Sequence, residues 1–157
     1  MTTFERIAND FHTVTDLLNA FVQTFDEEYS VEIGSDFEAD EMEEKIFYAV
    51  AVMDEGATSF RANFIKRYPL CANFDIFTLS FMHELGHLET EWDAVDDTKE
   101  RKKIKGLKDA EKYYALHNER IATDWAGEYL TENYDSMKVW ESKILEAFKK
   151  ILDKYPD

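Results

Sequence analysis

Hydrophobic positions near the N-terminus recur at alternating spacings of three and four residues. This spacing draws one apolar stripe along a helix of about 22 to 26 residues. The stripe consists of Phe4, Ile7, Phe11, Val14, Leu18, Phe21 and Phe25. Because it is short and rich in Phe, packing against a sheet or other helices suits it better than a coiled coil. We therefore expect one long helix over residues 4–25.

Three later segments predict strands. Residues 30–34 (SVEIG) form a short strand candidate that ends at a Gly-Ser-Asp turn. Residues 46–53 (IFYAVAVM) are apolar without polar alternation, which predicts a strand covered on both faces. After a turn at residues 54–56, residues 59–65 (SFRANFI) alternate apolar and polar side chains. They predict a half-buried edge strand, with a short helix as the alternative.

The rest of the chain is typical of helices. A cap at Asn73 or Asp75 predicts a helix to about residue 90. A short charged helix is predicted over residues 96–105, followed by a break at Gly106 and a long helix over residues 108–133. Residues 135–136 cap a last helix. The order of one helix, two or three strands and then helices predicts an α+β fold. A length of 157 residues suits one domain over residues 1–157.

Charge narrows the classes of partner. The formal net charge is −16, and residues 1–60 hold 15 Asp/Glu against two Lys/Arg. Such acidity disfavours nucleic acid and anionic membranes as partners and leaves basic proteins. The acidic residues 26–44 are either a docking surface for a basic protein or, as we favour, a solvated loop with a charged helix end. No apolar run is long enough to span a bilayer and no signal peptide is evident, so we expect a cytoplasmic location.

The sequence HELGH, near the end of the helix predicted after Asp75, is the first candidate for chemistry. On a helix, His83 and His87 lie one turn apart on the same face, and both imidazoles can converge on one ion while Glu84 faces a water beside it. Zinc suits two imidazole nitrogens and a carboxylate, with a fourth position left for water. Cys71 is the only cysteine, which excludes a Cys-rich metal site.

A third ligand is expected from another helix, and Glu119 is the best candidate. Its neighbours within about 60° around the helix are apolar or small. These neighbours are Ala115, Leu116, Ala122, Thr123, Ala126 and Leu130. A carboxylate on a core-facing stripe costs several kcal/mol unless it is paired or bound to metal. The small residues would also let this helix approach the HELGH helix closely, where Gly86 suits a tight contact.

HELGH followed some thirty residues later by NERIATDWA resembles the gluzincin branch of zincin metallopeptidases. Within that branch, it is similar to the small ImmA/IrrE-like peptidases associated with phages and mobile elements. Their order is a leading helix, a small sheet, the H-E-x-x-H helix and a glutamate helix with a pattern like E-x-x-A-x-x-[FW]-A. Here Glu119, Ala122, Trp125 and Ala126 carry that pattern. The sequence departs from thermolysin-like members at Thr123, where they place an aspartate that supports a histidine.

The resemblance implies zinc ligation by His83, His87 and Glu119, with Glu84 catalytic. It further implies hydrolysis of a peptide bond in an intracellular protein, such as a phage or mobile-element regulator. Tyr113 is one of three tyrosines, with Tyr114 and Tyr129, that remain candidates for stabilising an oxyanion. A second hypothesis is a non-enzymatic protein, either an inactive zinc-binding zincin fold or an acidic DNA mimic.

Overall fold

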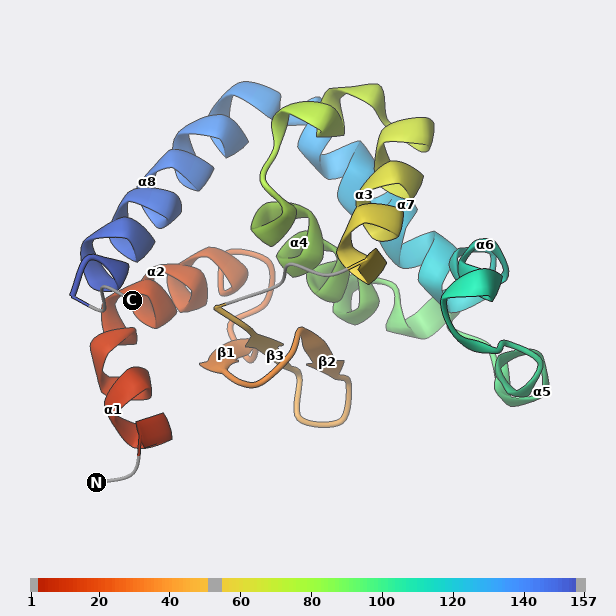
Figure 1. Cartoon of the computed structure of the whole chain (residues 1–157), viewed down its shortest axis with the longest axis horizontal. Coiled ribbons are helices and arrows are strands. Elements are labelled where there is room, and N and C mark those ends of the chain that lie inside the picture. Colours follow the sequence, from red (N-terminus) through yellow and green to blue (C-terminus); the bar gives the residue numbers. More distant parts are fainter. Residues whose placement is uncertain (1–2, 51–54, 155–157) are drawn as a thin grey trace.

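A computed structural model describes residues 3–50 and 55–154. It has the expected mixed α+β composition, with helices in the majority and one small sheet (Figure 1). The α-helices are α1 (Thr3–Asp10), α2 (His12–Val22), α3 (Glu55–Arg67), α4 (Ile76–Glu89), α5 (Thr98–Lys102), α6 (Ala110–Tyr114), α7 (His117–Glu132) and α8 (Tyr134–Leu152). The strands are β1 (Ser30–Ile33), β2 (Glu38–Asp40) and β3 (Lys45–Tyr48). Short 3-10 helices cover Pro69–Asn73, Glu91–Asp93 and Gly106–Asp109.

The sheet has the strand order β1-β3-β2. β3 is parallel to β1, with Val31 opposite Ile46, and antiparallel to β2, with Ala39 opposite Ile46. The strand predicted at residues 30–34 is confirmed. The strand predicted at 46–53 is shorter, and it alternates between buried and half-buried residues instead of being covered on both faces. Its residues 51–53 lie outside the described part. The acidic residues 26–44 contain β1 and β2, so they are not a loop throughout, and the choice between a docking surface and a solvated segment stays a prediction.

The prediction of one long N-terminal helix is also wrong in one respect, because the helix breaks into α1 and α2 at Phe11 (Figure 1). His12 Nδ1 donates to the carbonyl oxygen of Asn9 at 2.9 Å, an acceptor that a continuous helix would use for its own backbone. Phe11 is buried at the break, with its ring 5.6 Å from that of Phe148 on α8. The apolar spacing thus continues through a change of chain direction that the spacing alone does not reveal.

The edge strand predicted at residues 59–65 is wrong, since this segment belongs to α3. Phe60 and Phe64 are four residues apart, and on the helix their rings lie 5.1 Å apart. Arg61, on another side of the helix, donates to the backbone carbonyls of Ala72 and Phe74. Alternation over seven residues does not distinguish a strand from a helix. Phe60 and Phe64 are also spaced as neighbours on one face of a helix, and the chain is helical here.

The long helix predicted over residues 108–133 is divided as well. Leu116 takes an extended backbone conformation (φ −56°, ψ 137°), which ends α6 and starts α7 in a new direction. Gly106 has a φ of 72°, in the left-handed region, and so marks the break predicted there. The charged segment 96–105 contains the short α5, which has no buried residue. The last helix begins at Tyr134 without a side-chain cap, so the cap predicted at residues 135–136 is not formed.

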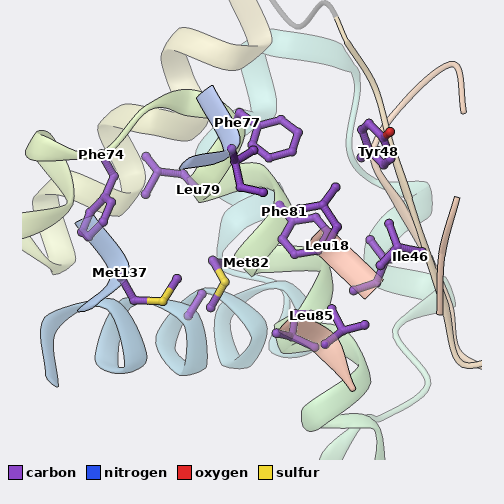
Figure 2. Packing of buried hydrophobic residues seen from close by; sticks show 14 of the residues in the cluster. Leu18, Ile46, Tyr48, Phe74, Phe77, Leu79, Phe81, Met82, Leu85 and Met137 are labelled. Carbon is purple, nitrogen blue, oxygen red and sulfur yellow. The ribbon is translucent and has the colours of Figure 1, made fainter. Parts of the chain in front are cut away.

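Helix α4 is the centre of the molecule. Most of its residues are buried, and it packs against α7, the sheet and α3. Figure 2 shows its Phe81, Met82 and Leu85 among side chains from the sheet, α2 and α8, including Tyr48 and Met137. Among the described residues no helix is long and apolar enough to cross a membrane.

The N-terminus of α4 is held by two carboxylates. Asp75 accepts from the backbone N–H of Phe77 at 2.9 Å, which confirms the predicted cap. Glu141, buried on α8, accepts from the backbone N–H of Asp75 at 2.8 Å and from the hydroxyl of Thr78 at 2.6 Å. Negative charge at this helix end is favourable because the unpaired N–H groups point toward it. The start of the HELGH helix is therefore tied to α8.

Candidate metal centre

Helix α4 places both histidines of HELGH on one face, as predicted. His83 is buried, His87 is partly buried, and their Nε2 atoms lie 3.1 Å apart. The two rings are nearly perpendicular, at 87°, with centroids 4.7 Å apart. The two nitrogen atoms, one helical turn apart, can therefore contact the same ion.

Helix α7 brings Glu119 to this point, which confirms the prediction that the third group comes from another helix. Glu119 is only 4% exposed. Its Oε1 lies 3.2 Å from His83 Nε2 and 3.3 Å from His87 Nε2. The approach depends on the α4–α7 contact, where a Cβ on Gly86 would collide with the backbone of Ala122. This tight contact was predicted for Gly86 from its position in the helix.

The three ligand atoms form a nearly equilateral triangle with sides of 3.1, 3.2 and 3.3 Å. Zinc bonds of about 2.0–2.1 Å at tetrahedral angles would separate any two ligand atoms by about 3.3–3.4 Å. The observed separations come close to that figure. The buried group of two histidines and one glutamate can therefore hold a metal ion.

Hydrogen bonding at His83 fits the same interpretation. His83 Nδ1 lies 3.0 Å from the hydroxyl oxygen of Thr123 on α7. A ligating imidazole usually donates its second ring N–H to a neighbouring oxygen, and Thr123 supplies one. In that tautomer, His83 Nε2 turns a lone pair toward Glu119 Oε1, and a cation between the two atoms would remove their repulsion. Without a cation, Nε2 carries a proton and donates it to Oε1.

Thr123 stands where thermolysin-like gluzincins place an aspartate. Its hydroxyl reaches His83 because the residue lies one turn after Glu119 on the face of α7 that meets α4, and it is only 2% exposed. The rings of Phe60 and Phe64 on α3 lie edge-on to the same imidazole, at 5.2 and 6.3 Å. The orientation of His83 is thus set from two sides.

The charges of the three groups are coupled. Burial by itself would raise the pKa of Glu119, but hydrogen bonds from His83 and His87 lower it strongly, so this carboxylate is ionised. Burial would lower the pKa of His87, but the hydrogen bond to Glu119 and its charge raise it. In the metal-free protein, a proton on His87 partly takes the place of a metal cation.

Glu84, the predicted catalytic residue, lies next to His83 on α4. It is largely buried, and this burial raises its pKa, opposed by the nearby imidazoles and assisted by the charges of Glu119 and Asp36. A carboxylate with a raised pKa is a better proton acceptor near neutral pH than an exposed one. Position and acidity therefore suit the role that was predicted for it.

Two residues join the site that the helical spacing did not assign to it. Arg101 on α5 donates from Nη2 to Glu119 Oε2 at 3.1 Å, and the hydroxyl of Tyr113 on α6 donates to Glu119 Oε1 at 2.8 Å. Burial and the charge of Glu119 raise the pKa of Tyr113, which keeps the hydroxyl protonated. Tyr113 was one of three tyrosine candidates, and the break at Leu116 turns α6 back so that it reaches Glu119.

The two other histidines of the chain make different contacts. His12 is exposed, and His117 bonds the backbone carbonyl of Asp93. Tyr129, another of the three tyrosine candidates, stacks on Trp125. Comparisons with protein-family models, with curated proteins and with solved structures find no match.

Proposed function

We propose that this protein is a zinc-dependent metallopeptidase with His83, His87 and Glu119 as metal ligands and Glu84 as catalytic residue. The observation that carries the proposal is the triangle of two imidazole nitrogens and one carboxylate oxygen with sides of 3.1–3.3 Å. Its resemblance to ImmA/IrrE-like peptidases adds a regulatory protein of a phage or mobile element as the substrate class.

Zinc is the metal that suits these residues. Two neutral imidazoles and one carboxylate are the three protein ligands of some zinc hydrolases, in which the fourth coordination position is open to water or substrate. Mg²⁺ and Ca²⁺ prefer sites built from oxygen ligands alone. When bound, zinc would lower the pKa of a water to about 7 and polarise a peptide carbonyl.

Glu84 moves the protons in this proposal. Its carboxylate takes a proton from the attacking water and delivers it to the nitrogen of the departing amine. Tyr113 donates its one hydroxyl hydrogen to Glu119 Oε1, and it would exchange this bond for one to the negative charge that develops on the carbonyl oxygen. Phe60 and Phe64 pack edge-on against His83 and shield it from water.

The sheet offers a place for an extended peptide beside α4. β2 packs against α4, and within residues 3–50 and 55–154 no strand pairs with its second edge. The outer edge of β1 is different, since the Asn19 amide of α2 bonds both the N–H and the carbonyl of Val31. A substrate that adds to β2 would use backbone hydrogen bonds that any sequence can make.

Charge favours a basic substrate at that edge. Asp36 lies close enough to Glu84 to help raise its pKa, and Glu41 does the same to His87. Both carboxylates are exposed and flank β2. Lys and Arg side chains of a bound peptide would therefore be attracted to the strand, and acidic peptides repelled.

Metal content tests the first half of the proposal. Protein purified without chelator should contain about one zinc per chain, and His83→Ala should contain almost none. His12→Ala, which removes a histidine far from the site, is the matched control and should keep its zinc. Absence of metal from both the wild-type protein and the control would refute the proposal.

Activity tests the second half. A co-expressed candidate repressor should be cleaved by the wild-type protein and left intact by Glu84→Gln, which keeps the shape of the side chain and removes its basicity. Cleavage that survives this change would remove Glu84 from its role. Zinc binding by the same residues without any cleavage would identify a non-enzymatic metal-binding protein.

The acidic DNA mimic is the second candidate, and the net charge of −16 favours it only if carboxylates form regular exposed rows. It predicts competition with DNA for a basic partner, and this competition should be as strong with His83→Ala as with the wild-type protein. A peptidase would instead process that partner only when its metal ligands are intact.

A further inference from the structure

Helix α5 reaches into the metal centre through one side chain. The guanidinium of Arg101 donates from Nε to Asp97 Oδ1 at 2.9 Å and from Nη2 to Glu119 Oε2 at 3.1 Å. Its central carbon lies 5.6 Å from the centre of the Tyr113 ring. The planar fork of an arginine can make these contacts at once, whereas the single ammonium of a lysine cannot reproduce them.

The two oxygens of Glu119 have different neighbours. Oε1 lies within 3.3 Å of both imidazole Nε2 atoms and accepts from the Tyr113 hydroxyl. Oε2 accepts from Arg101 but also lies 3.1 Å from His87 Nε2. Both oxygens are thus within reach of an ion held by His87, and the contact to Arg101 is what distinguishes them.

A carboxylate that ligates through both oxygens fills the position that a water or substrate needs. Catalytic zinc sites keep that position open with three protein donors. An arginine that engages Oε2 makes two-oxygen ligation unfavourable, because the oxygen would have to exchange a charge-assisted hydrogen bond for a second metal bond.

We propose that Arg101 is a positioning residue, which holds Glu119 Oε2 so that Oε1 alone ligates the metal. Asp97 is the anchor in this arrangement, since it accepts from Nε while Nη2 donates to Glu119. The inference rests on the proposed metal site and not on peptidase activity. It gives α5, which buries no side chain of its own, a function at the site.

Two variants of this network test the inference. Arg101→Met keeps the length of the aliphatic chain and removes the guanidinium, and Asp97→Asn removes the charge of the anchor without touching Glu119. Lys102→Met is the matched control, because it removes one positive charge from an exposed position of the same helix. Circular dichroism of each variant confirms that it is folded.

The readouts are zinc affinity, from competition with a chromogenic chelator, and the visible spectrum of the Co²⁺-substituted protein. Arg101→Met should bind zinc about tenfold more weakly than the wild-type protein, because Glu119 is no longer held in place and the second metal–oxygen contact offsets only part of that loss. Its Co²⁺ bands should lose intensity, because five-coordinate Co²⁺ absorbs less than four-coordinate Co²⁺. Asp97→Asn should shift both quantities in the same direction by a smaller amount, and Lys102→Met should match the wild-type protein.

Wild-type zinc affinity and an unchanged Co²⁺ spectrum in Arg101→Met would overturn the inference and leave the metal site intact. A wild-type protein that binds no zinc would overturn the inference together with the metal site. A protein that binds zinc but cleaves no substrate would refute only the peptidase proposal, because neither readout depends on turnover.

Discussion

Gly86→Ala tests the contact that brings together the two helices of the candidate metal centre. A Cβ at this position would lie less than 3.0 Å from the carbonyl oxygen of Ala122 and 3.1 Å from its Cα. Ordinary contact begins at 3.4 Å, so the backbones of α4 and α7 must separate by more than 0.4 Å. Neither partner is a side chain that can rotate away.

Two effects of opposite sign set the stability change. Alanine is favoured over glycine inside a helix by about 1 kcal/mol. Overpacking costs about 1–3 kcal/mol, occasionally more, and a collision between two backbones belongs at the upper end. We expect a net loss of about 2 kcal/mol, which lowers the melting temperature by about 4–8 °C for a chain of this size.

The same displacement should weaken the metal site. Binding groups need to be held within about 0.5 Å of their productive positions, and a separation of α4 from α7 moves Glu119 away from both histidines. Thermal unfolding in a chelator measures the first effect, and chelator competition for zinc measures the second. We expect zinc affinity to fall at least about tenfold.

Gly127→Ala is the control for this prediction. Its Cβ would collide with the ring of Tyr68, a half-buried side chain whose displacement leaves α7 in place against α4. It should lose stability and keep its zinc affinity. A Gly86→Ala protein that melts about 2–4 °C higher, as helix preference alone predicts, would refute the reasoning about the interface.

Two further predictions concern the histidines. Thr123→Val removes the oxygen next to His83 Nδ1 and should weaken zinc binding about 10–100-fold. Thr123→Ser keeps the hydroxyl and should bind zinc nearly as the wild-type protein does. Equal zinc affinities of the two variants would show that Thr123 does not orient the imidazole. In the metal-free protein the pKa of His87 is raised by Glu119. Its contribution to stability is therefore fully present below the unfolded pKa of about 6.5 and lost as the pH rises through the higher folded pKa. Denaturant unfolding in a chelator should show this decline for the wild-type protein, and a decline of equal size in His87→Gln would contradict it.

The sequence by itself identified three of the chemical groups and the reason they belong together. The spacing of His83 and His87 follows from the helical repeat, and the placement of Glu119 among small and apolar residues follows from the same repeat on a second helix. Local periodicity was sufficient because each residue's face is decided within a few turns of its own helix.

Only the tertiary structure decided where helices break and what meets at their ends. The apolar spacing runs unchanged through Phe11, and nothing in residues 108–133 marks the extended conformation of Leu116. Residues 59–65 carry a pattern that suits a strand or a helix, and packing of Phe60 and Phe64 on His83 decides for the helix.

Arg101 and Tyr113 reach Glu119 for the same reason. On one continuous helix, Tyr113 and Glu119 would be about 9 Å apart along the axis and on different faces, and Arg101 belongs to another helix altogether. The turn at Leu116 brings Tyr113 to the Glu119 carboxylate, and the position of α5 beside α7 brings Arg101 to it. Contacts of this kind join separate segments, so no local pattern encodes them. The sequence alone could assign the candidate metal ligands but not the residues that contact them from other helices.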